Sequence, residues 1–126
     1  MKFRYSRNFF PPAPAAPVTL SVPAKGLQIG PLPAFLDTGA DGTLVALRYL
    51  LEIEAPATEE MFLRSQWGER RSVVLYLVDV QLGDWTLSQI EVAGDDLSDE
   101  IVVGRDVLNQ LRVLLNGPEE SVEVLA

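Results

Sequence analysis

Short runs of alternating apolar and polar residues follow a proline-rich start. Residues 18–22 alternate in the way that is typical of a half-buried strand, and residues 32–36 form an apolar run that predicts a strand. Further strands are expected at 61–64, 72–82, 85–92 and 101–103. The first two of these flank a turn with its tip near Trp67 and Gly68, which predicts a hairpin.

Two segments have a weaker helical character. Residues 46–54 are rich in Leu and Ala, and residues 105–111 follow a glycine, so each predicts a short helix. The chain then closes with a hairpin that turns at Asn116, Gly117 and Pro118. Many short strands with one or two brief helices indicate an all-β, barrel-like domain.

The first residues differ in composition from the rest of the chain. Four prolines fall within residues 11–17, and this density is incompatible with the continuous apolar helix of a signal peptide. We therefore divide the chain into a basic, proline-rich arm at 1–17 and a domain at 18–126. The arm is interpreted either as an extended, polyproline-like segment or as a disordered leader. No run approaches the roughly 18 apolar residues of a membrane span, so no membrane association is expected.

Composition limits the chemistry. The 126 residues include no cysteine and no histidine, which argues against Cys or Ser/His nucleophilic catalysis and against the usual zinc sites. We expect no cofactor and no metal, with Asp and Glu as the acid–base groups. The formal net charge of −8 argues against nucleic acid as a partner. The absence of cysteine fits a cytoplasmic protein.

The most informative segment is residues 34–45, where apolar residues run directly into Asp37, Thr38 and Gly39. A buried strand thus delivers a carboxylate to a tight turn, although burying a lone carboxylate costs several kcal/mol unless it is paired or hydrogen-bonded. The simpler alternative is an ordinary turn, because Asp and Gly are common turn residues.

A second motif lies about 65 residues later, where three aliphatic residues precede Gly104, Arg105 and Asp106. The Asp-Thr-Gly-Ala-Asp segment followed by aliphatic residues and Gly-Arg-Asp resembles the retropepsins, the single-domain aspartic proteases of retroviruses and their bacterial relatives. The resemblance covers residues 18–126 in the order of elements. It implies a single-lobe acid-protease barrel with a flap hairpin and one short C-terminal helix.

The resemblance also implies a reaction. Hydrolysis of a polypeptide without a metal or a nucleophilic side chain needs a general base and a general acid, and two close carboxylates that share one proton can act as both. The chain has one Asp-Thr-Gly only, so a homodimer must bring the two Asp37 carboxylates together. Two other hypotheses remain: a retropepsin-fold domain that binds peptides or partners without cleaving them, and a structural β-domain with a coincidental motif.

Roles for the neighbouring residues follow from the same resemblance. Asp37 would be catalytic, the Thr38 hydroxyl would bond across the dimer axis, and Gly39 would let main-chain N–H groups approach the carboxylate. Gly104 would let the helix pack closely on the catalytic strand. Arg105 would pair with a partly buried Asp41 and support the site. The implied substrate-binding positions are Ala40, Asp41, Gly42, Trp67 and Gly68.

The two ends of the chain carry opposite charge. In retroviral enzymes the termini of both subunits share one sheet, and complementary charge would suit such pairing. The cationic residues are Lys2, Arg4 and Arg7, and the anionic ones are Glu119, Glu120 and Glu123. Solubility is the competing explanation, because an exposed ion pair contributes under about 1 kcal/mol.

Overall fold

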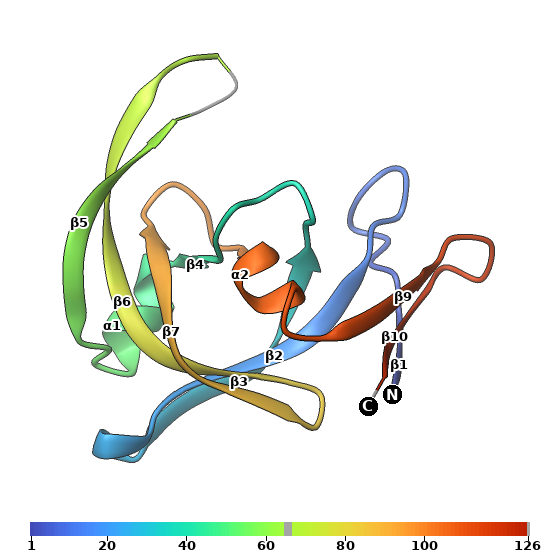
Figure 1. The fold of residues 1–126 in the computed structure, drawn as a ribbon, viewed down its shortest axis with the longest axis horizontal. Coiled ribbons are helices and arrows are strands. Elements are labelled where there is room, and N and C mark those ends of the chain that lie inside the picture. The colour runs from blue at the N-terminus through green and yellow to red at the C-terminus, as the bar shows by residue number, and fades with distance from the viewer. Residues whose placement is uncertain (65–66, 126) are drawn as a thin grey trace.

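A computed structural model describes residues 1–64 and 67–125, and strands make up most of them (Figure 1). The strands are β1 (Lys2–Arg4), β2 (Ala15–Val22), β3 (Leu27–Leu36), β4 (Leu44–Ala46), β5 (Ala57–Arg64), β6 (Arg70–Leu82), β7 (Trp85–Asp95), β8 (Ile101–Val103), β9 (Arg112–Asn116) and β10 (Ser121–Leu125). The helices are α1 (Leu47–Glu52) and α2 (Arg105–Leu108), with a 3₁₀ turn at Pro23–Lys25. Within the described part of the chain, no helix is long and apolar enough to cross a membrane.

Six strands close into a barrel. The hydrogen-bonded order of the main sheet is β2-β3-β8-β4-β7-β6-β5, and an additional pairing of β2 with β6 joins its two sides. β5 lies outside the closed ring and extends β6 as a long antiparallel hairpin. The predicted all-β barrel with a projecting hairpin is therefore confirmed.

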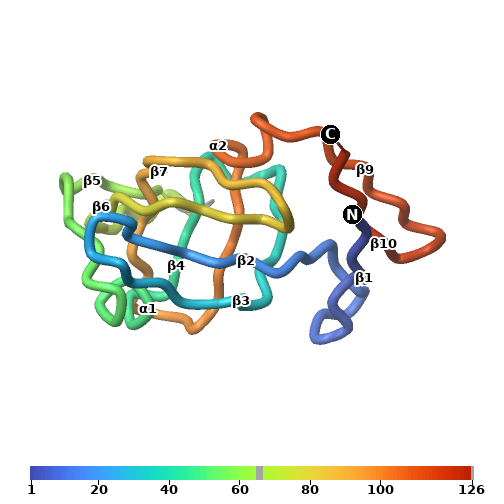
Figure 2. The backbone as a smooth tube through the Cα atoms, turned by 90° about the horizontal axis from the view of Figure 1, so that it is seen from below, coloured from blue at the N-terminus to red at the C-terminus, as the bar shows by residue number. Residues whose placement is uncertain are grey.

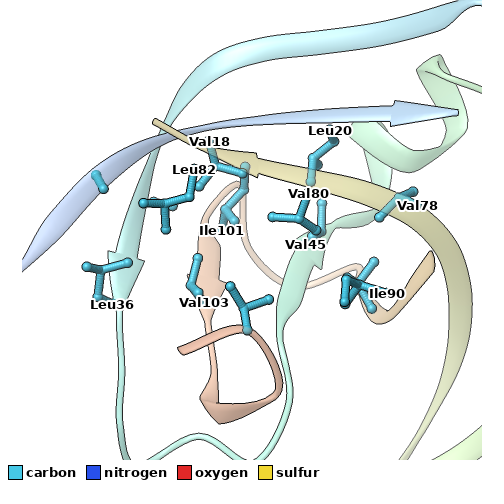
Figure 3. Packing of buried hydrophobic residues seen from close by; sticks show 14 of the residues in the cluster. Val18, Leu20, Leu36, Val45, Val78, Val80, Leu82, Ile90, Ile101 and Val103 are labelled. Carbon is cyan, nitrogen blue, oxygen red and sulfur yellow. The ribbon is translucent and has the colours of Figure 1, made fainter. Parts of the chain in front are cut away.

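The core fills the inside of this barrel. Leu20, Val45, Val80, Val92 and Val103 come from five different strands, and each is completely buried. Figure 3 shows such side chains converging between the strands. Burial of each Val or Leu side chain stabilises the fold by roughly 1.5–3 kcal/mol relative to an exposed one. The apolar positions that alternate in the sequence therefore supply the core that stabilises the closed barrel.

A second, smaller sheet joins the two ends of the chain in the order β1-β10-β9. Figure 2 shows it to one side of the barrel, and the Val124 amide donates to the Met1 carbonyl at 2.9 Å. Lys2 lies 3.8 Å from Glu119 and Arg7 lies 3.1 Å from Glu120, so the opposite charges meet within one chain. The division into arm and domain stays a prediction, but the arm contributes strand β1.

Several predicted element boundaries were wrong. β2 begins at Ala15 rather than at residue 18, because two alanines of the proline-rich stretch are small enough to enter the core. β5 begins at Ala57 rather than at residue 61, because an exposed edge strand needs no apolar alternation. α2 ends at Leu108 instead of 111, since the bonds that follow span three residues as the chain turns into β9.

Candidate active site

Asp37 stands at the first residue beyond β3, and main-chain bonds fix it there. Its amide donates to the Val103 carbonyl of β8 at 2.9 Å, and its own carbonyl accepts the Ala40 amide at 3.2 Å, which closes a tight turn. The Gly39 amide donates to Asp37 Oδ1 at 2.8 Å. A Cβ added at Gly39 would lie 3.1 Å from this same oxygen, so a glycine suits the close approach. The turn presents a half-buried carboxylate in a fixed orientation.

Gly104 brings α2 against the turn. A Cβ on this residue would lie 2.5 Å from the Gly42 carbonyl oxygen and 2.9 Å from that of Ala40. The Arg105 amide also donates to the Ala40 carbonyl at 2.9 Å. The closest packing at Gly104 is therefore with the turn that follows Asp37.

The Arg105 side chain forms hydrogen bonds to two residues of the same turn. Nη1 donates to the Thr38 carbonyl at 2.8 Å, and Nη2 donates to Asp41 Oδ1. The Asp41 side chain is 94% exposed and that of Arg105 is 42% exposed. The sequence predicted a partly buried Asp41. This is wrong for the single chain, because the Asp41 side chain extends from the turn into solvent. The Thr38 side chain is exposed as well.

We expect Arg105→Ala to lower activity more than stability. An exposed ion pair contributes under about 1 kcal/mol, so the melting temperature should fall only slightly. The Thr38 carbonyl, however, loses the donor that positions it beside Asp37. Arg105→Lys should restore activity in part, because lysine lacks the planar fork that reaches both oxygens. Thermal unfolding and kcat/KM are measured on both variants. A large fall in melting temperature, or an unchanged kcat/KM, would contradict this prediction.

Thr43 and Asp106 form a connection that our sequence analysis missed. Thr43 is 2% exposed, its hydroxyl donates to Asp106 Oδ1 at 2.7 Å, and its amide donates to Oδ2 at 3.1 Å. The same hydroxyl accepts the Gly104 amide at 3.1 Å. Each of the two motifs thus contributes a side chain that holds the other. Both residues belong to the two conspicuous segments of the sequence, and this could have drawn attention to them. The spacing of residues alone, however, does not indicate which side chains form hydrogen bonds with each other.

The β5–β6 hairpin rises from the same side of the barrel as the turn after β3 (Figure 1). At its base, Val73 and Leu75 are buried against Leu44, Leu63 and Ala93. Leu44 is the first residue of β4, the strand that follows the Asp37 turn. A small apolar cluster therefore joins the base of the hairpin to β4 and β7.

The tip of the hairpin is described only in part. Ser65 and Gln66, which belong to the predicted tip, lie outside the described residues. Trp67 is 81% exposed, so it does not pack into the core. Gly68 has a φ of +82°, a conformation that favours glycine.

Comparison with solved structures bears on the fold. A retropepsin-like aspartic protease from Rickettsia conorii superposes with a TM-score of 0.62 at 12% identity, over 100% of this chain and 92% of that one. The chain has a retropepsin-like fold. The retroviral protease-like domain of Ddi1 from Leishmania major matches with a TM-score of 0.48 at 14% identity, over 90% of this chain and 96% of that one. No family model and no curated protein matches the sequence.

In this retropepsin-like chain, the flap is tied to the end of β7. Arg71 Nη2 donates to Asp95 Oδ1 at 3.0 Å, and the Asp95 side chain is 14% exposed. Burial tends to raise the pKa of Asp95, but hydrogen bonds from the Leu97 amide, the Ser98 hydroxyl and Arg71 outweigh it and hold the pKa below its usual value. Asp95 is therefore ionised at neutral pH and holds Arg71, which pairs with Leu63 close to the tip end of the hairpin.

Proposed function

We propose that the chain is an aspartic endopeptidase that cleaves polypeptides as a homodimer. The observation that carries this proposal is the Asp37 carboxylate, fixed on a tight turn on the same side of the barrel as the long hairpin, in a retropepsin-like fold. The sequence has no second Asp-Thr-Gly, so the other carboxylate must come from a second copy. The two turns would then face each other across a two-fold axis.

The proposed reaction uses only the two carboxylates and water. Like charges about 3 Å apart cannot both ionise, so the pair carries one proton. The ionised Asp37 takes a proton from the water as it attacks the peptide carbonyl, and the protonated one donates to the carbonyl oxygen. The leaving amine is then protonated as the C–N bond breaks. Thr38 and Gly39 hold the two turns, and positions 40–42 border the substrate main chain.

An apolar groove beside the catalytic turn supports the dimer. It has a volume of about 190 Å³ and is lined by Thr38, Leu36 and Leu108, together with side chains of β9. β9 is an edge of the terminal sheet, and its Leu115 is 44% exposed on the rim of the groove. A second copy docked at this edge would cover the leucine and bring the two turns close together.

Mixing wild-type protein with Asp37→Asn should reduce the activity of the wild type. With about a tenfold excess of the variant, random pairing leaves roughly one tenth of the activity, because most wild-type subunits then lie in dimers with a single carboxylate. Cleavage of an unfolded protein at mildly acidic pH is the assay. The same excess of Asp84→Asn, a variant in the exposed β6–β7 turn, should not inhibit.

Two outcomes would separate this function from its alternative. Unchanged activity in the mixture, with wild type active at concentrations where sedimentation shows monomers, would contradict the homodimer mechanism. Peptide binding by the wild-type dimer without any cleavage would favour a retropepsin-fold binding domain.

A further inference from the structure

A pocket of about 140 Å³ lies beside the candidate active site. It is lined by the Phe35 ring at the end of β3, by Asn8 and Phe9 of the N-terminal arm, and by Asp99 and Glu100 before β8. Pockets for whole small molecules are typically about 300 Å³ or larger, so this volume suits a single side chain.

The pocket is lined by a residue of the strand that leads into the catalytic turn, Phe35 of β3. Ala34 and Leu36 point into the core at 2% and 5% exposure, so Phe35, two residues before Asp37, leaves β3 on the opposite face. Two residues of extended chain span about 6.6 Å. A substrate strand lying over Asp37 therefore places a neighbouring side chain within reach of Phe35.

The acidic rim belongs to the same face. Val102 pairs with Phe35, and its neighbours Ile101 and Val103 are buried in the core. Glu100 lies two residues before Val102, and its carbonyl accepts the Ala46 amide at 3.1 Å, so the chain is already extended there. By alternation, Glu100 stands on the face of Phe35.

The arm forms a fixed wall of this pocket. The rings of Phe9 and Phe35 have centroids 5.2 Å apart. Ser6 and Ala13 exchange two main-chain hydrogen bonds of 2.8 and 3.0 Å, and the Leu36 amide donates to the Pro14 carbonyl at 3.0 Å. The arm is thus bound to the strand that carries Asp37.

The charge of the pocket is negative. Asp99 is paired with Arg48 at 3.3 Å, whereas within the described residues Glu100 has no ion-pair partner. No Lys or Arg is among the residues that line the pocket. A long side chain with an apolar stem and a cationic end matches two aromatic rings below a carboxylate rim.

We propose that this pocket is a substrate subsite that selects a lysine or arginine side chain next to the scissile bond. The inference rests on the proposed protease function and specifies its substrate class: polypeptides with a cationic residue within about two positions of the cleaved bond, as the strand geometry requires. Glu100 would be the residue that determines this specificity, with Phe9 and Phe35 holding the stem.

The test is a peptide series in which Lys, Met or Glu occupies each of the two positions on either side of the scissile bond. At one position we expect kcat/KM for Lys to exceed that for Met by about two- to fivefold, the effect of one exposed ion pair, and Glu to be cleaved more slowly than Met. Glu100→Gln should remove the preference for Lys over Met, so that the two peptides are cleaved with similar kcat/KM. Glu100→Lys should favour the Glu peptide.

Two further variants separate charge from packing. Phe9→Ala should slow the Lys and Met peptides alike, because it removes the wall and not the charge. Asp84→Asn neutralises an exposed carboxylate outside the pocket and should leave the ratio of Lys to Met unchanged. The proposal would be overturned if Lys and Met peptides had equal kcat/KM at every position. It would also be overturned if Glu100→Gln did not alter a preference for Lys.

Binding distinguishes failure of the subsite from failure of the protease. Fluorescence polarisation with Asp37→Asn measures the affinity of the same labelled Lys and Met peptides without cleavage. Tighter binding of the Lys peptide that depends on Glu100, in a wild-type protein that cleaves nothing, would support the subsite and reject the catalytic function. Equal binding of both peptides would reject the subsite.

Discussion

Asp37→Asn is expected to abolish peptide hydrolysis while leaving the fold intact. The amide has the shape of the carboxylate and keeps an oxygen for the Gly39 amide, which donates to Oδ1 at 2.8 Å. It can neither take a proton from water nor share one with its copy. Acid–base groups typically contribute about 10²–10⁴-fold each, so the loss in kcat/KM should be on the order of 10⁴-fold or more. Progress curves on an unfolded protein substrate measure this loss.

The control for this prediction is structural. Circular dichroism and sedimentation of Asp37→Asn should match those of the wild type, because the substitution changes no core residue. Asp84→Asn makes the same change of charge in an exposed turn and should keep full activity. If Asp37→Asn retained more than about a tenth of the wild-type rate, Asp37 would not be the general acid–base group.

The sequence predicted the fold largely from residues that alternate between core and surface. Ile101 and Val103 are buried, and the Asp37 amide bonds to the Val103 carbonyl, so two motifs about 65 residues apart lie on neighbouring strands. The resemblance to a known family predicted this pairing, because each motif stands at the end of a strand and the two strands belong to the same sheet. Gly39 likewise lies where its amide reaches the carboxylate.

The sequence did not predict features that depend on which side of a turn a side chain leaves. Asp41 and Thr43 are two residues apart, yet Asp41 is 94% exposed and Thr43 is 2% exposed. In a turn there is no period of two or 3.6 from which to read burial. The same limit applies to the arm, because an extended proline-rich segment pairs with the domain only through contacts such as Phe9 with Phe35, which are distant in sequence.

Gly104→Ala is expected to impair both stability and activity. The added Cβ would lie 2.5 Å from the Gly42 carbonyl oxygen and 2.6 Å from its carbon, and both atoms are main chain and cannot rotate away. Either α2 or the turn after Asp37 must shift, which weakens the bonds from the Thr43 hydroxyl to Asp106 and from the Gly104 amide to that hydroxyl. Overpacking of this kind typically costs about 1–3 kcal/mol. Denaturant unfolding measures that loss.

Activity should fall further than stability alone explains, because a shift of about 1 Å in a catalytic group can reduce the rate on the order of 10²-fold. Gly117→Ala is the matched control, since a Cβ there meets nothing within 4 Å. Gly42→Ala tests the other side of the contact, where the nearest atom to a new Cβ is Asp106 Oδ2 at 3.9 Å, and it should leave the unfolding free energy nearly unchanged. If Gly104→Ala were as stable and active as Gly117→Ala, the contact between α2 and the turn would not position Asp37.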